Sequence, residues 1–318
     1  MPRRHRRSDL HQHILAIMDE TGVEDPHEAV RTKARDVISQ FHQLFGGEPP
    51  FDVKAIASLR GLHWSDDDPR FSPDSEIAPE SDGRVVLRVD KTRPLTRQRF
   101  SICHEVGHTL FPEYQLEVRC RKGDRRSFAD PEDLLETLCD VAASELMFPT
   151  PWFDDCLKLL SISAENLAKL ADDFEASRDA TARRVVEVHP SAMAAVFFSW
   201  KLKPVEEREL KASRMTPSLF PALDLPEPEP KLRVDYRIAN RAFDERVNEF
   251  IPQSKSIPCE GPIFEASMSQ IPVDGKQTLD FGRKSRHFSV SALPIYTNET
   301  AIGPNGGCSV VAILQPLD

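Results

Sequence analysis

The spacing of apolar residues predicts a helical first half of the chain and a strand-rich second half. Apolar positions that recur every three or four residues are typical of helices with one buried face. Short apolar runs bounded by turn residues are typical of strands. Helices are expected over residues 9–46 (broken near Gly22 to Pro26), 51–59, 95–111 and 131–148. Strands are expected over residues 85–89, 194–200, 232–238, 288–293 and 309–314.

The helix expected over 95–111 carries the sequence His104-Glu105-Val106-Gly107-His108. At ~100° per residue the two histidines lie ~40° apart, so both imidazoles can reach one metal ion. Glu105 lies ~100° from His104, where it can hold a water as a general base. Gly107 lies beside the histidines, and we expect it to leave room for a substrate backbone. This His-Glu-x-x-His pattern is typical of zinc hydrolases.

The surroundings of the motif support a helix with two different faces. Ile102, Val106 and Leu110 lie ~160–240° from His104 and predict a buried stripe, which leaves the histidines on a cleft face. Thr96 is expected to cap the helix and Pro112 to end it.

A catalytic zinc site needs a third protein ligand, which we expect on the helix over 131–148. Glu136 and Asp140 are four residues apart and share one face of this helix, opposite an apolar stripe. We assign Glu136 to the zinc and Asp140 to the second ring nitrogen of a ligand histidine. A solvated acidic face is the alternative. Glu145 projects to the apolar side, and the sequence gives no reason for it.

The chain resembles the ImmA/IrrE-type zinc metallopeptidases over roughly residues 30–190. The most specific stretches are Arg99–His108 and Glu136-x-x-x-Asp140-x-Ala142-Ala143-x-x-Leu146-Met147-x-Pro149. Weaker likeness lies in residues 34–38, 50–57 with Gly61, and 167–183. The family also commonly has asparagine at the position of Asp140, and either side chain can accept a hydrogen bond from an imidazole.

The resemblance implies a zinc endopeptidase with a narrow substrate. That substrate would be a regulatory protein, often a helix–turn–helix transcriptional repressor, in a stress, mobile-element or toxin–antitoxin response. A catalytic zinc lowers the pKa of its water toward about 7, and Glu105 would take the proton and pass it to the leaving amine. Tyr114, Arg183 and His189 are candidates to stabilise the oxyanion, with no geometry to choose among them.

These features predict an α+β fold with a zincin-like helical metallopeptidase domain that holds a small sheet, followed by a smaller β-rich or α+β domain. We expect a basic tail and short helix over 1–24, the metallopeptidase domain over 25–190, and a C-terminal module of unknown role over 191–318. Five prolines between residues 214 and 230 indicate a linker or an extended loop. The strand over 85–89 precedes the zinc helix, where we expect it to pair with an extended substrate.

Composition bears on the class of protein and on the cellular compartment that we expect for it. No run of eighteen apolar residues occurs, and the basic N-terminus lacks the apolar segment of a secretory signal. The six cysteines are scattered, without a Cys-x-x-Cys pair, so we expect reduced thiols in a cytoplasmic protein. Cys103 precedes His104 and Cys139 precedes Asp140 in the sequence. We expect both cysteines to pack in the core. The sequence leaves the oligomeric state open.

A second hypothesis uses residues 163–189, whose spacing resembles a helix–turn–helix. Arg178, Arg183 and Arg184 could meet phosphate there, which would make the chain a DNA-binding transcriptional regulator with a structural or vestigial metal site. The net charge of −10 and the acidic residues within the segment weaken this reading. We expect a structural helix pair packed on the zinc domain. A silent interaction module is a third reading, which the intact Glu105 opposes because a structural zinc site needs no general base.

Overall fold

The computed structural model describes residues 12–69, 74–112, 119–120, 131–215, 228–280, 285–295 and 303–317. Contacts divide the chain into two compact units. The first comprises residues 1–158 with 173–177, and the second comprises 159–172 with 178–318. The expected boundary at residue 190 differs from this division, because helix α8 (Arg178–Val188) packs on the sheet of the second unit. The fold is α+β in both units, as the sequence predicted.

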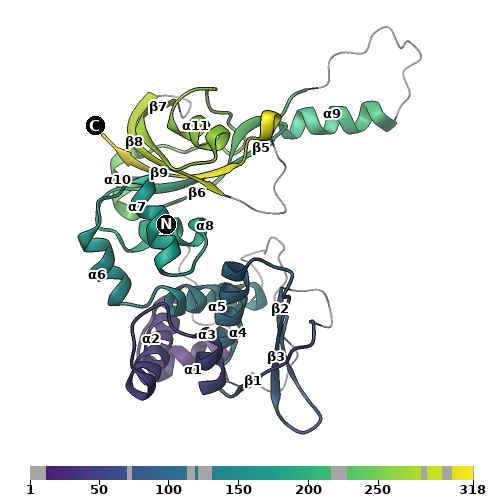
Figure 1. Ribbon diagram of the computed structural model, residues 1–318, viewed down its shortest axis with the longest axis vertical. Coiled ribbons are helices and arrows are strands. Elements are labelled where there is room, and N and C mark those ends of the chain that lie inside the picture. Colours follow the sequence, from purple (N-terminus) through teal and green to yellow (C-terminus); the bar gives the residue numbers. More distant parts are fainter. Residues whose placement is uncertain are drawn as a thin grey trace. The chain divides into compact units, whose positions relative to one another are not determined.

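The motif helix of the first unit packs against two other helices of that unit on one side and against its small sheet on the other (Figure 1). The expected break near residue 22 is present, because Gly22 adopts a positive φ of 68° and Asp25 caps the next helix by accepting from Glu28 N. In Figure 1, α4 and α5 lie between the α2 side of the unit and the small sheet. The helices are α1 (Gln12–Thr21), α2 (Pro26–Phe45), α3 (Val53–Leu59), α4 (Leu95–His108), α5 (Pro131–Met147) and α6 (Trp152–Leu159).

The ends of α4 differ from the expectation. Pro94, rather than Thr96, occupies the N-cap position, and no side chain makes a capping hydrogen bond there. The helix ends at His108, four residues before Pro112, because the backbone tightens into a turn in which Thr109, Leu110 and Phe111 donate to carbonyls three residues earlier.

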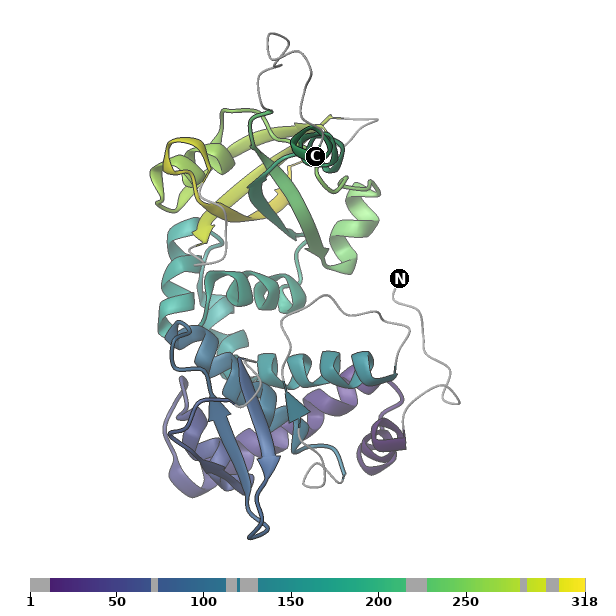
Figure 2. The ribbon, with the colours of Figure 1, turned by 90° about the vertical axis from the view of Figure 1, so that its right-hand side faces the viewer.

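A four-stranded sheet lies beside α4 in the first unit (Figure 2). Its strands are β1 (Leu62–Trp64), β2 (Ser75–Pro79), β3 (Val85–Val89) and β4 (Arg119–Cys120), in the order β1-β3-β2-β4. β1 and β3 are parallel, and the other pairs are antiparallel. Because β3 has a hydrogen-bonded neighbour on each side, the expectation that it pairs with a substrate strand is wrong.

The second unit is an antiparallel sheet with helices on both faces. The strand order is β6-β5-β9-β8-β7. Helix α8 packs on β5, β6, β8 and β9, and α11 packs on β7, β8 and β9. The remaining elements are α7 (Ala164–Asp173), β5 (Ala194–Lys201), α9 (Pro204–Met215), β6 (Lys231–Ala239), α10 (Arg241–Val247), α11 (Pro262–Ser269), β7 (Val273–Asp280), β8 (Ser285–Ile295), a 3-10 turn (Pro304–Gly306) and β9 (Ser309–Pro316).

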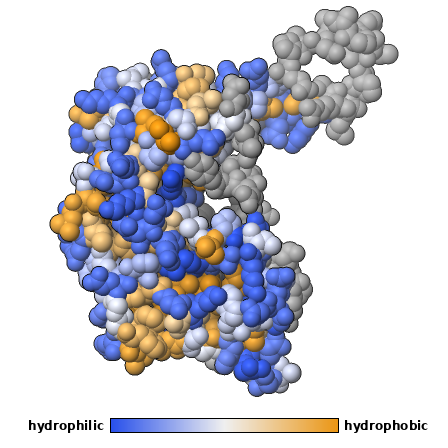
Figure 3. Space-filling model, in the orientation of Figure 1, coloured by the Kyte–Doolittle hydropathy of each residue, from blue (hydrophilic) through white to orange (hydrophobic). Residues whose placement is uncertain are grey.

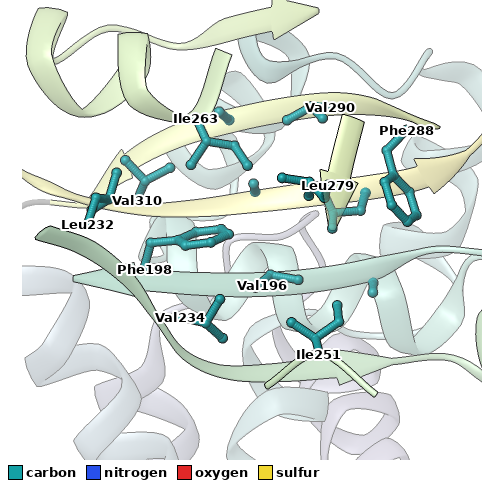
Figure 4. Close-up of a cluster of buried hydrophobic side chains, with 14 of the residues drawn as sticks. Val196, Phe198, Leu232, Val234, Ile251, Ile263, Leu279, Phe288, Val290 and Val310 are labelled. Carbon is teal, nitrogen blue, oxygen red and sulfur yellow. The ribbon is translucent and has the colours of Figure 1, made fainter. Parts of the chain in front are cut away.

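One face of this sheet forms the apolar core shown in Figure 4. Alternate residues of each strand contribute to it, such as Val196 and Phe198 of β5. Phe243 of α10 and Ile263 of α11 close the core from outside the sheet. The face drawn in Figure 3 carries hydrophilic residues together with hydrophobic ones, and the hydrophobic ones gather mainly at its lower left. Among the described residues, none of the helices combines the length and apolar character that a membrane span requires.

Candidate metal centre

Helix α4 places His104, Glu105 and His108 inside the first unit. All three side chains are fully buried. The predicted apolar stripe of Ile102 and Val106 is buried as well. The helix is in fact buried on every side from Ser101 to His108, so the expectation of one core face and one open cleft face is wrong. Three buried polar side chains on one helical turn require partners, because unpaired polar groups are costly to bury.

One carboxylate, that of Glu136 on α5, approaches both histidines. Its Oε2 lies 3.3 Å from His104 Nε2, and its Oε1 lies 3.4 Å from His108 Nε2. In a tetrahedral zinc site with bonds of about 2.0–2.1 Å, ligand atoms lie about 3.3–3.4 Å apart. The two histidine–carboxylate separations, one to each oxygen of Glu136, are therefore of the size expected between ligand atoms of one metal site. Glu136 keeps 22 % of its side chain exposed, which gives the site one wetter side.

The second nitrogen of His104 faces Asp140, one turn further along α5. Nδ1 lies 2.8 Å from Asp140 Oδ1. Because a carboxylate only accepts hydrogen bonds, Nδ1 carries the proton and donates it. In the neutral ring this leaves the lone pair on Nε2, directed at Glu136. The lone pair of His104 Nε2 and the Glu136 carboxylate, 3.3 Å apart, would repel each other unless a proton or a metal cation lay between them. A histidine that binds a metal through Nε2 is in this situation.

The electrostatics around His104 favour positive charge. Burial lowers its pKa, but the hydrogen bonds to Asp140 and Glu136 and the charge of Glu105 outweigh burial and raise the pKa from 6.5 to about 9. The same carboxylates that hold a proton on the ring would attract a metal cation. The assignments of Glu136 as ligand and Asp140 as orienting carboxylate stay predictions, now with a geometry that accommodates them.

Cys139 offers a possible sulfur donor beside the histidines. Its buried Sγ lies 3.3 Å from His108 Nδ1, and His104, His108 and Cys139 form a group compact enough to hold a metal ion. However, the thiol faces Nδ1, whereas Glu136 faces the Nε2 atoms of both rings. A metal held by Cys139 and His108 through Nδ1 would be a different site. The sequence analysis assigned Cys139 to core packing alone and missed this contact.

Gly107 serves the packing of α4 on α5. A Cβ at this position would lie 3.0 Å from Cys139 O, 3.1 Å from Cys139 Cα and 3.2 Å from Ala142 Cβ. The expectation that Gly107 leaves room for a substrate backbone is therefore wrong, because α5 fills that space. The close approach of the two helices brings Glu136 and Asp140 within reach of the histidines.

Glu145 belongs to the structure of the unit rather than to the metal site. Its fully buried carboxylate pairs with Arg35 Nε of α2 at 3.0 Å and accepts from Thr150 N at 3.3 Å. This contact explains why a charged residue lies on the apolar side of α5, which the sequence left unexplained. The ion pair ties α2 to the end of the helix that carries Glu136 and Asp140.

Ser75 is the contact to Glu105 that the sequence analysis missed. Its Oγ donates to Glu105 Oε1 at 2.6 Å, and both side chains are fully buried. Ser75 begins β2, a strand whose sequence Ser-Glu-Ile-Ala-Pro lacks an apolar alternation. Only the fold brings this hydroxyl to α4, so no sequence signal marks it.

The candidates for oxyanion stabilisation gain no support. Tyr114 lies outside the described residues. Arg183 and His189 belong to the second compact unit. Arg183 Nε donates to Asp179 at 2.5 Å, and its guanidinium stacks 4.8 Å from the ring centroid of Phe197.

The basic residues proposed to meet DNA are engaged within the second unit. Besides the contacts of Arg183, Arg178 Nη1 donates to the backbone carbonyl of Pro294 at 2.9 Å. Arg184 is buried and pairs with Glu187 at 3.2 Å. These side chains help to hold α8 on the sheet. Contacts within the protein therefore account for the three arginines without any role in binding DNA. The basic residues at the start of the tail, before residue 12, lie outside the described residues.

Comparison with known proteins agrees with the motifs. The chain is 27 % identical over 179 residues to the radiation response metalloprotease IrrE of Deinococcus radiodurans and 32 % identical over 114 residues to that of Deinococcus deserti. These matches cover 52 % and 32 % of this chain, and 48 % and 35 % of the relatives. The chain thus spans less than half of the curated relatives it matches.

A solved structure described as a Mycobacterium tuberculosis transcriptional regulator shares the fold. The match has a TM-score of 0.53 and 12 % identity and covers 96 % of this chain and 80 % of the other. Residues 62–186 also match the family model of the IrrE N-terminal-like domain, a stretch that holds His104, Glu105, His108, Glu136 and Asp140. This part of the chain is therefore similar to the IrrE N-terminal-like domain, in agreement with the resemblance that its motifs indicated.

Proposed function

We propose that this chain is a zinc-dependent endopeptidase. His104, His108 and Glu136 would hold the metal, and Glu105 would be the general base. The observation that carries the proposal is the distance of both Nε2 atoms to one carboxylate, 3.3 and 3.4 Å, which matches the edges of a tetrahedral site. Glu105, which is fully buried beside the histidines, would supply a general base, and a structural zinc site needs none.

Each side chain has a distinct task in this proposal. A bound zinc would act as a Lewis acid toward the scissile carbonyl and toward water. Glu105 would take a proton from the attacking water and deliver it to the leaving amine. Asp140 would keep the proton of His104 on Nδ1, so that Nε2 remains a donor to the metal.

We further propose a specific regulatory protein as substrate, such as a helix–turn–helix repressor in a stress, mobile-element or toxin–antitoxin response. The family resemblance and the relatives named radiation response metalloproteases support this substrate class. The scattered cysteines support a reducing compartment such as the cytoplasm. A protease of this kind would degrade casein slowly, and vigorous digestion of unrelated proteins would contradict it.

The substitution Glu105→Gln tests the proposed chemistry. It keeps the size of the side chain but removes the base, so we expect full zinc content and a loss of turnover of roughly 10²–10⁴-fold. Glu165→Gln, at an exposed position of α7, is the matched control and should keep full turnover. If Glu105→Gln retained its turnover, the proposed mechanism would be refuted.

DNA binding remains testable as the rival reading. If the chain reads DNA through α8, its affinity should fall steeply with salt and be lost on substitution of Arg183 and Arg184. Because both side chains are engaged within the second unit, we expect no such binding.

A further inference from the structure

We propose that Ser75 is a positioning residue that fixes the orientation of the Glu105 carboxylate. This inference rests on the function proposed above, in which Glu105 is the general base. It assigns a role to a strand residue that lies thirty positions before Glu105 in the sequence.

The contact itself is short and fully enclosed. Ser75 Oγ donates to Glu105 Oε1 at 2.6 Å, within the range of about 2.5–2.7 Å for a hydroxyl bound to an ionised carboxylate. Such hydrogen bonds are roughly twice as strong as neutral ones. A serine hydroxyl has a single proton to donate, and Ser75 directs that proton to Glu105.

The position of Ser75 is set by contacts on both sides of it. Its backbone pairs with Val89 in β3. The preceding residue, Asp74, is buried; it accepts a hydrogen bond from Arg97 Nε of α4 at 2.8 Å and forms an ion pair with Arg93, just before that helix, at 2.9 Å. The start of β2 is therefore tied to the helix that carries Glu105, and the Ser75 hydroxyl has little freedom to move relative to it.

The consequence for the reaction follows from the torsions of glutamate. A general base must hold one carboxylate oxygen within about 2.6–3.2 Å of the proton it abstracts. With Oε1 held by Ser75, rotation about the last torsion is restricted and the direction of Oε2 is set. Without the hydroxyl, the carboxylate would sample other orientations and be in place for a smaller fraction of the time. The metal donors and the substrate contacts would be unchanged.

The test compares Ser75→Ala and Ser75→Thr with the wild-type chain. We expect Ser75→Ala to lower kcat by roughly 10-fold or more while KM stays within about 2-fold and zinc content stays complete. Ser75→Thr keeps a hydroxyl and should recover most of kcat. Ser291→Ala is the matched control, because Ser291 also donates to a carboxylate, that of Asp274 in the second unit, at 2.7 Å. It should leave kcat unchanged.

A measurement without turnover keeps this inference separate from the proposed function. In zinc-free protein, Ser75→Ala should lower Tm in the wild-type background and change it much less in a Glu105→Ala background, because the two groups are coupled. Equal shifts in both backgrounds, or an unchanged kcat in Ser75→Ala, would overturn the positioning role. If the zinc-loaded wild type cleaves nothing, the proposed function and the positioning role both fall, while the Tm cycle still reports whether the contact exists.

Discussion

The substitution Gly107→Ala separates two explanations of the glycine in the motif. The sequence suggested that Gly107 gives a substrate room, whereas the structure fills that space with α5. A new Cβ would lie 3.0–3.2 Å from three atoms of α5, and two of those belong to the backbone of Cys139 and cannot rotate away. Ordinary contact needs about 3.5 Å or more, so α5 would have to retreat by about 0.3–0.5 Å.

The expected magnitude is a balance of two terms. Overpacking costs about 1–3 kcal/mol, and alanine in a helix gains about 1 kcal/mol over glycine. The net loss of about 0–2 kcal/mol corresponds to a Tm lower by at most about 8 °C for a unit of this size. The retreat of α5 also moves Glu136 and Asp140 away from the histidines. We therefore expect zinc affinity to fall about 10-fold or more.

Chelator competition measures the zinc affinity of Gly107→Ala, and thermal unfolding of zinc-free protein measures its stability. Thr96→Ala is the control on the same helix, because Thr96 does not occupy the N-cap position. An unchanged zinc affinity with an equal or higher Tm and a raised KM would refute the packing explanation and restore the substrate explanation.

Three further predictions concern residues of the first unit. Arg35→Ala should destabilise the protein by about 3 kcal/mol in chemical denaturation, because it removes a cation that pairs with the buried Glu145 carboxylate; a loss below 1 kcal/mol would contradict that. Cys139→Ser should keep zinc affinity within a few-fold, and loss of the metal would make the thiol a ligand. His104 has its pKa raised from 6.5 to about 9, so its stabilisation of zinc-free protein is complete below pH 6.5 and is lost as pH rises through about 9. Zinc binding at pH 7.5 should accordingly release close to one proton, as measured by calorimetry in two buffers.

The sequence predicted the parts of the fold that periodicity encodes. The break near Gly22, the strand over 85–89 and the strands β5, β6, β8 and β9 of the second unit follow from local patterns, and the structure has them. Strand β7 was missed because its sequence, Val-Asp-Gly-Lys-Gln-Thr-Leu-Asp, is mostly polar. Its pairing with β8 decides its conformation, and that is a long-range contact no local pattern shows.

Some features of the site could likewise be predicted from the sequence, and others appear only in the fold. Spacing along two helices was enough to select His104, His108, Glu136 and Asp140, because residues four apart on a helix share a face. It could not show how deeply α4 is buried, since that depends on the sheet and on the approach of α5. The roles of Ser75 and Gly107 arise only from contacts between elements, so they appear only in the fold.

The most direct test of the central claim is the metal content of the purified protein and of Glu136→Ala, by elemental mass spectrometry. The geometry predicts about one zinc per wild-type chain and much less in the variant. A wild-type protein that takes up no metal, even with zinc supplied during purification, would contradict the account. Full zinc in Glu136→Ala would remove Glu136 from the site.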